Sequence, residues 1–510
     1  MDLIKYLLCI VSLLAVSEAN YHGNYYCKDG KDVMVHLFEW RWDDIANECE
    51  NYLSKNGYCG VQISPPNEHR IIIGGDGYKD YPWYQRYQPV SYKLISRSGN
   101  EEQFRNMVKR CNDVGVYIYA DAVINHMTAG GIGVGSGGSN WNGDNQDFPG
   151  VPYSDWDFHG RNECPTEDLN IHDYNNPQQV RFCRLLGLRD LKHSKDYVQE
   201  KIAEYLNNLI SIGVAGFRID ASKHMEVSRI GEILGRLRNL NTEWFPAGTK
   251  AFVFQEVIDM GSEPIKAEHY FPNGRVTEFK HCKELGDVIR KNNGQKLRYL
   301  RNWGPEWNMM PGMDAIIFTD NHDNQRGHGA GGFGSILTFF EDRQYKIANS
   351  FMLAWPYGYI KIMSSYRWNR QIVDGQDRND WIGPPSSPPG VTKPVECFGE
   401  WVCEHRWRQI SNMVKFHNAA VGTSVQNWWD NGENAIAFSR GNKAFIAINN
   451  ENFAVEETFQ TGLPAGDYCD VISSENNRPP CSGKPITVNG DGTARVRIEN
   501  DSDPVVALHV

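Results

Sequence analysis

The feature that most constrains this chain is the alternation of short β-rich runs with amphipathic stretches between about residues 33 and 364. The predicted strands lie at residues 33–38, 60–64, 116–123, 216–220, 251–257, 275–279, 314–319 and 359–363. Several of them are apolar on both faces, as expected of parallel strands that helices cover. Eight such strands alternating with helices predict an α/β fold, a closed (β/α)8 TIM barrel, which takes roughly 250 residues.

Two stretches do not fit a single barrel. The segment 125–192 is rich in Gly, Asn, Asp and Pro and is too long for one crossover, so we predict an inserted loop-rich domain after strand 3. After residue 423 the predicted strands, separated by turn residues, lie at 435–438, 444–449, 458–463, 467–472, 485–488, 494–498 and 505–510. This pattern is typical of an antiparallel β-sandwich. The predicted barrel therefore spans 20–124 and 193–423, and the C-terminal β-sandwich domain spans 424–510.

The N-terminus and the charge predict location and partners. Residues 7–16 form a short apolar run after Lys5 that ends in Ser17-Glu18-Ala19, which indicates a signal peptide at 1–19. No later run is long and apolar enough to span a bilayer. The net charge of −11 disfavours nucleic acid and anionic membranes as partners. We therefore expect a secreted, extracellular protein with a neutral substrate.

The cysteines fit an oxidising compartment. The chain has 12, and removal of Cys9 with the signal leaves an odd number, so at least one thiol is free or pairs between chains. The short spacings of Cys397 with Cys403 and of Cys469 with Cys481 predict local loop disulfides. A zinc site is the alternative, and the absence of CxxC and HExxH disfavours it.

Polar clusters follow four of the predicted strands, where barrel enzymes place their sites. They are Asp-Ala-Val-Ile-Asn-His (121–126), Gly-Phe-Arg-Ile-Asp-Ala-Ser-Lys-His (216–224), Phe-Gln-Glu-Val (254–257) and Thr-Asp-Asn-His-Asp (319–323). Asp220, Glu256 and Asp323 are thus predicted to converge on one rim. Each alone is better explained as a rim salt bridge or a helix cap. Together they suit glycoside hydrolysis, in which one carboxylate attacks while another protonates the leaving oxygen.

These four segments match signature regions of the animal-type α-amylases of glycoside hydrolase family 13, which the chain resembles over nearly its whole mature length. Segments 35–40, 245–248, 323–332 and 427–432 are also similar to that animal branch. The resemblance implies retaining endo-hydrolysis of α-1,4-glucosidic bonds in starch, glycogen and malto-oligosaccharides by a monomer.

The resemblance also implies residue roles. Asp220 would be the nucleophile, Glu256 the general acid/base and Asp323 the transition-state stabiliser. Arg218, two residues before Asp220, would keep that carboxylate ionised by charge pairing. The implied substrate-binding positions are the sugar-stacking aromatics Trp83, Tyr84 and Tyr87 and the polar residues Asp121, His126, Arg218, Lys223, His224, His322 and His328.

Two ion sites follow from the same resemblance. The implied Ca²⁺ ligands are Asn125, Asp190 and the backbone carbonyls of Arg181 and His224, oxygen donors of the kind a hard cation prefers. The implied Cl⁻ ligands are Arg218, Asn321 and Lys361. The family's commonest residue at the last position is arginine, and lysine offers one cationic point instead of a fork, so weaker chloride binding is expected.

The disulfide pattern departs from the family in part. The resemblance implies Cys49–Cys111 and Cys164–Cys183 in addition to the two local pairs. Ile95 stands where a further family bridge begins, so that bridge is missing. Outside the family pattern, we predict a Cys27–Cys59 bond with Cys282 left free.

Three alternatives to an active amylase are open. A secreted carbohydrate-binding homologue without catalysis is disfavoured by the three rim carboxylates. An enzyme of short α-glucosides is disfavoured by the animal-type loops and the C-terminal sheet. A metal-dependent barrel hydrolase is disfavoured because His36 is followed by Leu37 and Phe38, where a His-x-His is usual.

Overall fold

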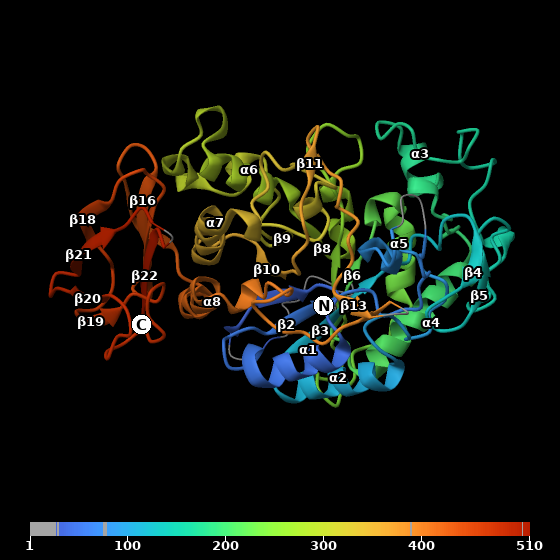
Figure 1. Ribbon diagram of the computed structural model, residues 1–510, viewed down its shortest axis with the longest axis horizontal. Helices are drawn as coiled ribbons and strands as arrows, with labels where there is room; N and C mark the ends of the chain where they lie inside the picture. The colour runs from blue at the N-terminus through green and yellow to red at the C-terminus, as the bar shows by residue number, and fades with distance from the viewer. Residues whose placement is uncertain (1–26, 28–29, 75–78, 388–389, 502) are drawn as a thin grey trace, which may run out of the picture.

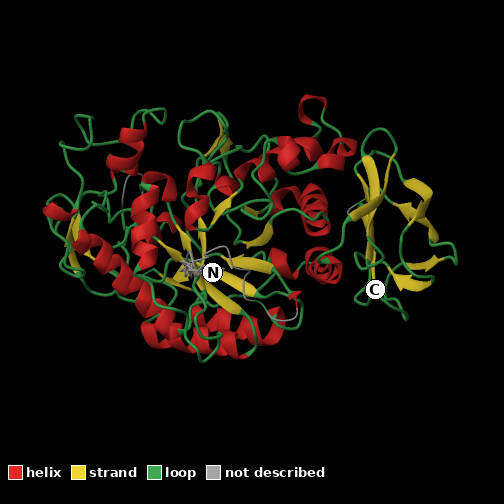
Figure 2. Cartoon of the chain, turned by 180° about the vertical axis from the view of Figure 1, so that it is seen from behind, coloured by secondary structure: helices red, strands yellow, loops and turns green. Residues whose placement is uncertain are grey.

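Eight parallel strands form a closed barrel in the computed structural model, which describes residues 27, 30–74, 79–387, 390–501 and 503–510 (Figures 1 and 2). The predicted signal peptide lies outside the described residues. In spatial order the strands are β1 (Val33–Leu37), β10 (Tyr359–Ser364), β9 (Ala315–Ile317), β8 (Arg275–Thr277), β7 (Phe252–Gln255), β6 (Gly216–Ile219), β3 (Tyr117–Ala122) and β2 (Gly60–Ile63). The eight predicted strands are confirmed, and all but β10 are shorter than predicted because their last residues leave the ladder to form the rim.

The barrel register already brings functional side chains together. Arg218 of β6 is the direct partner of Asp121 in β3 and of Phe254 in β7. The three strands can approach this closely because β6 begins with Gly216. A Cβ atom there would lie 2.1 Å from the carbonyl oxygen of Phe252, so no other residue fits. The register therefore fixes Arg218 between its neighbours before any loop is considered.

Helices surround the barrel, as the alternating pattern predicts. They are α1 (Trp42–Glu48), α2 (Glu101–Asp113), α4 (Asp196–Ile212), α5 (Val227–Gly235), α6 (Phe279–Arg290), α7 (Asp342–Ala354) and α8 (Arg408–Ala420). After β7 the connection contains a 3₁₀ segment, η7 (Ala267–Asn273), in place of a long α-helix. Helix α4 ends where expected, at Gly213, whose φ of +115° is accessible mainly to glycine.

A loop-rich segment is inserted between β3 and β6. It carries the hairpin β4 (Ile132–Val134) and β5 (Asn140–Asn142) and the short helix α3 (Pro177–Phe182). Part of it packs around a carboxylate of the loop after β2, because the backbone N–H groups of Gly137 and Ser139 each donate to Glu68 Oε1 at 2.8 Å. The insertion is thus anchored to the barrel next to the rim.

The C-terminal part is an antiparallel β-sandwich, drawn in red in Figure 1. One sheet contains β15 (Val425–Asp430), β16 (Ala435–Arg440), β17 (Ala444–Asn449) and β22 (Val505–His509). Facing it are the pairs β18 (Val455–Gln460) with β21 (Thr493–Ile498) and β19 (Gly466–Cys469) with β20 (Pro485–Val488). Along β17, Phe445 and Ala447 point into the sandwich core, whereas Ile446 and Ile448 belong to the main core shared with the barrel. β16, β17 and β22 are therefore buried on both faces, whereas β15 at the edge is partly exposed.

Two predicted features of the sandwich differ from the structure. β15 was not predicted, because its Val-Gln-Asn-Trp-Trp-Asp sequence is polar in the first half and its register is interrupted between Gln426 and Trp429. β18 begins three residues before the predicted strand at 458–463. Its Glu456 and Glu457 are exposed, which hides the strand from a search for apolar runs.

The structure contains the five predicted disulfides: Cys27–Cys59, Cys49–Cys111, Cys164–Cys183, Cys397–Cys403 and Cys469–Cys481. Cys282 is buried and free, and burial raises the pKa of its thiol. Within the described residues, no helix has the length and apolar character needed to cross a membrane.

Candidate active site

The carboxyl ends of three neighbouring strands meet around the guanidinium group of Arg218, which is 1% exposed. From Nη1, Arg218 donates to Asp121 Oδ1 in β3 and to Asp220 Oδ1 just beyond β6, both at 2.7 Å. Its Nη2 lies 2.7 Å from Glu256 Oε1, just beyond β7. A single buried cation thus holds three carboxylates on the rim of the barrel.

The backbone after β6 adds a second contact to Glu256. Ala221 has a φ of +48°, a left-handed conformation that costs a non-glycine residue on the order of 1 kcal/mol. In this conformation its backbone N–H donates to Glu256 Oε2 at 2.9 Å. The strained turn therefore positions the Glu256 carboxylate beside Asp220.

Asp323 joins this cluster from the loop after β9. Its Oδ2 lies 3.3 Å from Nε2 of His322. The His322 ring stacks on Tyr87 with ring centres 5.1 Å apart, and the Tyr87 hydroxyl donates to Asp121 Oδ2 at 2.9 Å. The structure thus brings Asp220, Glu256 and Asp323 to one rim.

Burial sets the protonation of these groups. It raises the pKa of Asp220 well above its usual range and raises that of Asp121 as well. Burial, with the negative charge of Glu256, raises the pKa of Asp323 to about 6. Arg218 does favour the ionised form of Asp220, as predicted, but burial outweighs that pairing. Burial therefore raises the pH at which Asp121, Asp220 and Asp323 lose their protons, and the positive charge of Arg218 opposes this effect at all three.

An aromatic wall stands beside the carboxylates. Trp83, Tyr84 and Tyr87 lie on one 3₁₀ segment, η3 (Trp83–Tyr87), and the Trp83 ring centre is 5.8 Å from Tyr84 and 5.9 Å from Tyr87. The Trp83 ring is also 5.6 Å from that of His322. His126 lies behind the segment, with Nε2 2.9 Å from the Tyr87 carbonyl oxygen.

His328 extends this wall through a residue that sequence reasoning missed. Its Nε2 lies 3.1 Å from Oδ2 of Asp380, and this hydrogen bond raises the pKa of His328. The Trp83 indole donates to the Asp380 backbone carbonyl at 2.8 Å. Asp380 lies in a segment of short hairpins without a recognisable motif, so no signal in the sequence singled it out.

Lys223 and His224 lie on the 3₁₀ segment η6 (Ser222–His224) after β6, and both are largely buried. Lys223 donates from Nζ to the Ile258 carbonyl at 2.8 Å and forms an ion pair with Glu263. His224 is bound through Nδ1 to the Val180 carbonyl of α3 at 2.9 Å. Lys223 is thus positioned by the loop after β7 and His224 by the inserted segment. Glu263 is a second residue that sequence reasoning missed.

Buried oxygens without partners mark the predicted calcium ligands. Asn125 and Asp190 are buried, and Oδ1 of each lacks a hydrogen-bond partner. The other Asp190 oxygen lies 2.6 Å from His159 Nδ1. Backbone pairing of His126 with Asp190 brings the two ligand positions together. The described residues contain no cluster of three or more His, Cys, Asp or Glu side chains that could hold a metal, so apart from the Asp190 carboxylate this site would depend on amide and backbone oxygens.

The predicted chloride ligands are Arg218, described above, together with Lys361 and Asn321. Lys361 of β10 is buried and donates from Nζ to Gln62 Oε1 of β2 at 2.9 Å. Burial, with the nearby charge of Arg218, lowers its pKa to about 7. Asn321 accepts through Oδ1 from the backbone N–H of Asn324 at 2.8 Å, so its amide NH₂ group remains as a donor. Gln62 is the one polar residue in the Val-Gln-Ile run of β2, a signal that could have identified it.

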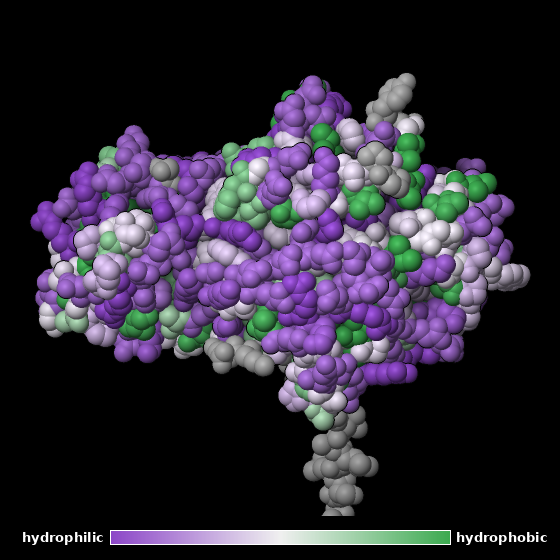
Figure 3. Space-filling model, turned by 60° about the horizontal axis from the view of Figure 1, so that its bottom comes forward, coloured by the Kyte–Doolittle hydropathy of each residue, from purple (hydrophilic) through white to green (hydrophobic). Residues whose placement is uncertain are grey.

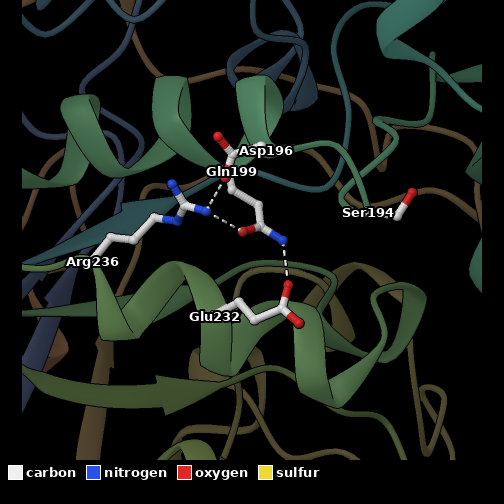
Figure 4. A pocket seen from close by; sticks show the side chains of 5 residues that line it. All are labelled: Ser194, Asp196, Gln199, Glu232 and Arg236. Atoms are coloured by element: carbon white, nitrogen blue, oxygen red, sulfur yellow. Dashed lines mark hydrogen bonds and ion pairs between the residues drawn. The ribbon is translucent and has the colours of Figure 1, made fainter.

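A surface hollow of about 300 Å³ between α4 and α5 is a separate feature (Figure 4). Its polar side chains bind one another: Arg236 donates to Asp196 and Gln199, and Gln199 donates to Glu232. None of the rim carboxylates lines this hollow.

The face of the molecule in Figure 3 is mostly hydrophilic, with scattered hydrophobic residues. The rim therefore remains the candidate site.

A parallel barrel that carries several buried carboxylates at the carboxyl ends of its strands has the architecture of a barrel enzyme with acid/base chemistry. Comparison with known proteins shows which family within this class the chain matches. Residues 78–245 match the α-amylase catalytic domain, and residues 426–510 match the α-amylase C-terminal all-β domain.

Full-length relatives give the same result. An α-amylase of Oryzias latipes is 54% identical over 513 residues, with 99% of each chain covered. Human pancreatic α-amylase is 56% identical over 493 residues, covering 94% of this chain and 95% of that one. The crystal structure of α-amylase I from Eisenia fetida is 60% identical, with a TM-score of 0.94, and covers 96% of this chain and 99% of its own. The chain therefore belongs to the α-amylase family of glycoside hydrolases.

Proposed function

We propose that the protein hydrolyses internal α-1,4-glucosidic bonds of starch, glycogen and malto-oligosaccharides with retention of configuration. The observation that carries this proposal is that Asp220 and Glu256 bind the two terminal nitrogens of one guanidinium group, each at 2.7 Å. This geometry favours the short carboxylate separation of retaining enzymes, about 5–5.5 Å, over the wider spacing of inverting ones. The solved complex of a mutant Eisenia fetida α-amylase I with maltohexaose supports the substrate class.

The proposed reaction has two steps. An oxygen of Asp220 attacks the anomeric carbon while Glu256 donates its proton to the glycosidic oxygen, which leaves with the reducing-end part of the chain. Glu256 then accepts a proton from the water that attacks the same carbon, and Asp220 leaves as a carboxylate. Asp323 stabilises the distorted, positively charged sugar in both transition states.

The substrate is neutral, and the surrounding residues are suited to that. Tyr84 and Tyr87 are partly exposed and offer ring faces on which the C–H faces of glucose can pack without any charge. The buried ring of Trp83 packs against both of them. His322 is buried, and burial keeps its pKa well below the usual value, so it meets the sugar as a neutral imidazole. The positive charge of Arg218 is balanced by three carboxylates, so it does not favour an anionic substrate over a neutral one.

The stereochemical course tests this proposal. Proton NMR of early hydrolysis products of a malto-oligosaccharide is expected to show the α-anomer first, followed by mutarotation. Amylose digestion is expected to lower viscosity and iodine binding early, before much reducing sugar has formed, as internal cleavage requires. Initial release of the β-anomer would refute retention, and release of single short products from chain ends would refute the internal mode.

We also propose that Ca²⁺ binds Asn125, Asp190 and the backbone carbonyls of Arg181 and His224. The unpartnered, buried Oδ1 atoms of Asn125 and Asp190 fit a hard cation. When bound, the ion would link the inserted segment to the loop after β6 by binding oxygens of both. The ligand from His224 would thereby hold the loop that follows Asp220.

Removal of calcium is therefore expected to lower both stability and activity. A ligand present at about 100 times its Kd stabilises the folded state by about 2.7 kcal/mol. The melting temperature, measured by calorimetry with excess calcium or with a chelator, should fall on chelation and recover on adding calcium back. In the Asp190→Asn variant the calcium-dependent part of this shift should shrink strongly. Identical melting curves with and without calcium would refute the site.

We propose a chloride site formed by Arg218, Asn321 and Lys361. Its fit is supported by the proximity of two buried cations, since the Arg218 charge contributes to the lowered pKa of Lys361. When bound, the anion would offset that repulsion and add negative charge near the carboxylates. Lys361 would hold it with a single ammonium group.

Chloride activation is expected to weaken as pH rises. Lys361 is protonated below its pKa of about 7 and binds an anion in that form, so the half-activating chloride concentration should increase from about pH 6 to about pH 8. Lys361→Arg should lower that concentration by about tenfold and remove its pH dependence, because guanidinium stays charged. Activity titrated with chloride against a gluconate control measures both effects. Equal chloride dependence at both pH values in the native protein would refute this role for Lys361.

We further propose that the protein is secreted and acts as a monomer. The apolar segment 7–16 and the five disulfides support export, because disulfides persist in oxidising compartments. Expression in a eukaryotic host should yield a medium form that begins near residue 20, and size-exclusion chromatography with light scattering should give the monomer mass. Retention of the uncleaved chain in cells would refute export.

A further inference from the structure

Arg326 is a buried cation enclosed by aromatic rings. It ends the 3₁₀ segment η11 (Asn324–Arg326) that follows Asp323, and it is 1% exposed. Its guanidinium carbon lies 4.3 Å from the Trp368 ring centre, 5.0 Å from Tyr366, 5.2 Å from Phe38 and 5.5 Å from Trp83. These rings come from the loops after β1, β2 and β10, so one side chain joins four loops of the rim.

This cation lacks a close anionic partner. Arg326 forms no ion pair within the described residues, and its Nε and Nη2 atoms lack hydrogen-bond partners there. Its charge acts on the buried Asp320 carboxyl, where it favours the ionised form. Burial of an unpaired charge costs several kcal/mol, and cation–π contacts recover about 0.5–2 kcal/mol each. An apolar side chain of similar size would fill the same space at lower cost. Stability alone is therefore a poor explanation for an arginine at this position.

The contacts of Arg326 lead to the residues that would touch the sugar. Its Nη1 donates to the His322 backbone carbonyl at 2.9 Å, and its own backbone N–H donates to the Asp323 carbonyl at 3.0 Å. The same guanidinium supports the Trp83 ring, which lies 5.6 Å from the His322 ring. One side chain thus contacts both the aromatic wall and the loop that carries Asp323.

We propose that Arg326 is a positioning residue for catalysis, which fixes His322, Asp323 and Trp83 relative to one another from behind the cleft wall. The inference rests on the proposed function, because it assumes that these three residues line the site of cleavage. Arginine suits this role because its planar fork can donate to a carbonyl while its faces stack on rings. Lysine would keep the charge and lose both the fork and the stacking face.

The test compares Arg326→Met, Arg326→Lys and Arg440→Met. Arg440 is a matched control because it is also buried and donates to backbone carbonyls, those of Ala354, Ala420 and Thr423, away from the rim. Both kcat and KM for maltoheptaose are measured per folded molecule, together with melting temperatures. We expect both Arg326 variants to lose roughly 10- to 100-fold in kcat, the scale of a misplaced catalytic group, with a smaller change in KM. Arg440→Met should lose stability and keep its kcat.

The outcomes separate this inference from the proposed function. If folded Arg326→Met and Arg326→Lys keep native kcat, or if Arg440→Met loses as much, Arg326 has a structural role only and the inference is wrong. If Asp220→Asn remains active in the same assay, the proposed function itself fails. Should Arg326→Met not fold, Arg326→Lys, which keeps the charge, decides between the two roles.

Discussion

Replacing Asp220 with asparagine is expected to reduce the turnover of starch by about 10⁴- to 10⁶-fold, the scale on which loss of a nucleophile or its partner affects a hydrolase. Asparagine is close in size to aspartate and can still accept a hydrogen bond from Arg218. It cannot attack the anomeric carbon to form an ester. The variant should therefore fold and bind malto-oligosaccharides while kcat is almost abolished, which calorimetric binding and a reducing-sugar assay can measure together.

The control for this prediction is Asp196→Asn. Asp196 begins α4 on the outer face of the barrel, its side chain is 81% exposed, and it pairs with Arg236 (Figure 4). The same chemical change there removes a surface ion pair, which is worth at most about 1 kcal/mol. Asp196→Asn should keep native kcat. If Asp220→Asn kept native turnover as well, Asp220 would not be the nucleophile.

The fold could be predicted from sequence because the barrel strands carry a strong local signal. Runs such as Phe-Val-Phe in β7 are apolar on both faces, and Gly213 ends α4 as its position indicates. The pattern of apolar residues does not predict an element whose place depends on contacts with distant parts of the chain. β15 is polar in its first half and forms a strand because it pairs with β16. The connection after β7 contains a 3₁₀ segment, which has no apolar periodicity that would predict it.

The positions of candidate site residues that directly follow barrel strands could be predicted from the sequence. The positions of residues that long loops bring to the site from distant parts of the chain could not. Asp220 and Glu256 come directly after β6 and β7, so the barrel topology alone places them on one rim. Asp380 reaches Trp83 and His328 from a segment far along the chain, and Glu263 reaches Lys223 from another. These contacts depend on the paths of long loops, which neither composition nor motif spacing determines.

Replacing Glu256 with glutamine should separate the general acid from the nucleophile. The amide keeps the contact with the Ala221 N–H but has no acidic proton, so starch hydrolysis should fall by about 10²- to 10⁴-fold, the usual contribution of acid–base catalysis. In α-maltosyl fluoride the leaving group is the fluoride ion, which departs without protonation. Asp220 can therefore still form the glycosyl ester from that substrate, and early fluoride release should stay much closer to the native rate.

This pattern distinguishes the two carboxylates, because Asp220→Asn should lose activity on both substrates. Glu232→Gln is the matched control, since Glu232 lies on α5 away from the rim, pairs with Arg229 and is 42% exposed. It should hydrolyse both substrates at native rates. In Glu256→Gln the ester should then accumulate, because no base activates the incoming water, and mass spectrometry of the quenched protein should show the added sugar on Asp220. Equal losses on starch and on the fluoride would contradict the acid/base role, because protonation of the leaving group would then not be what Glu256 supplies.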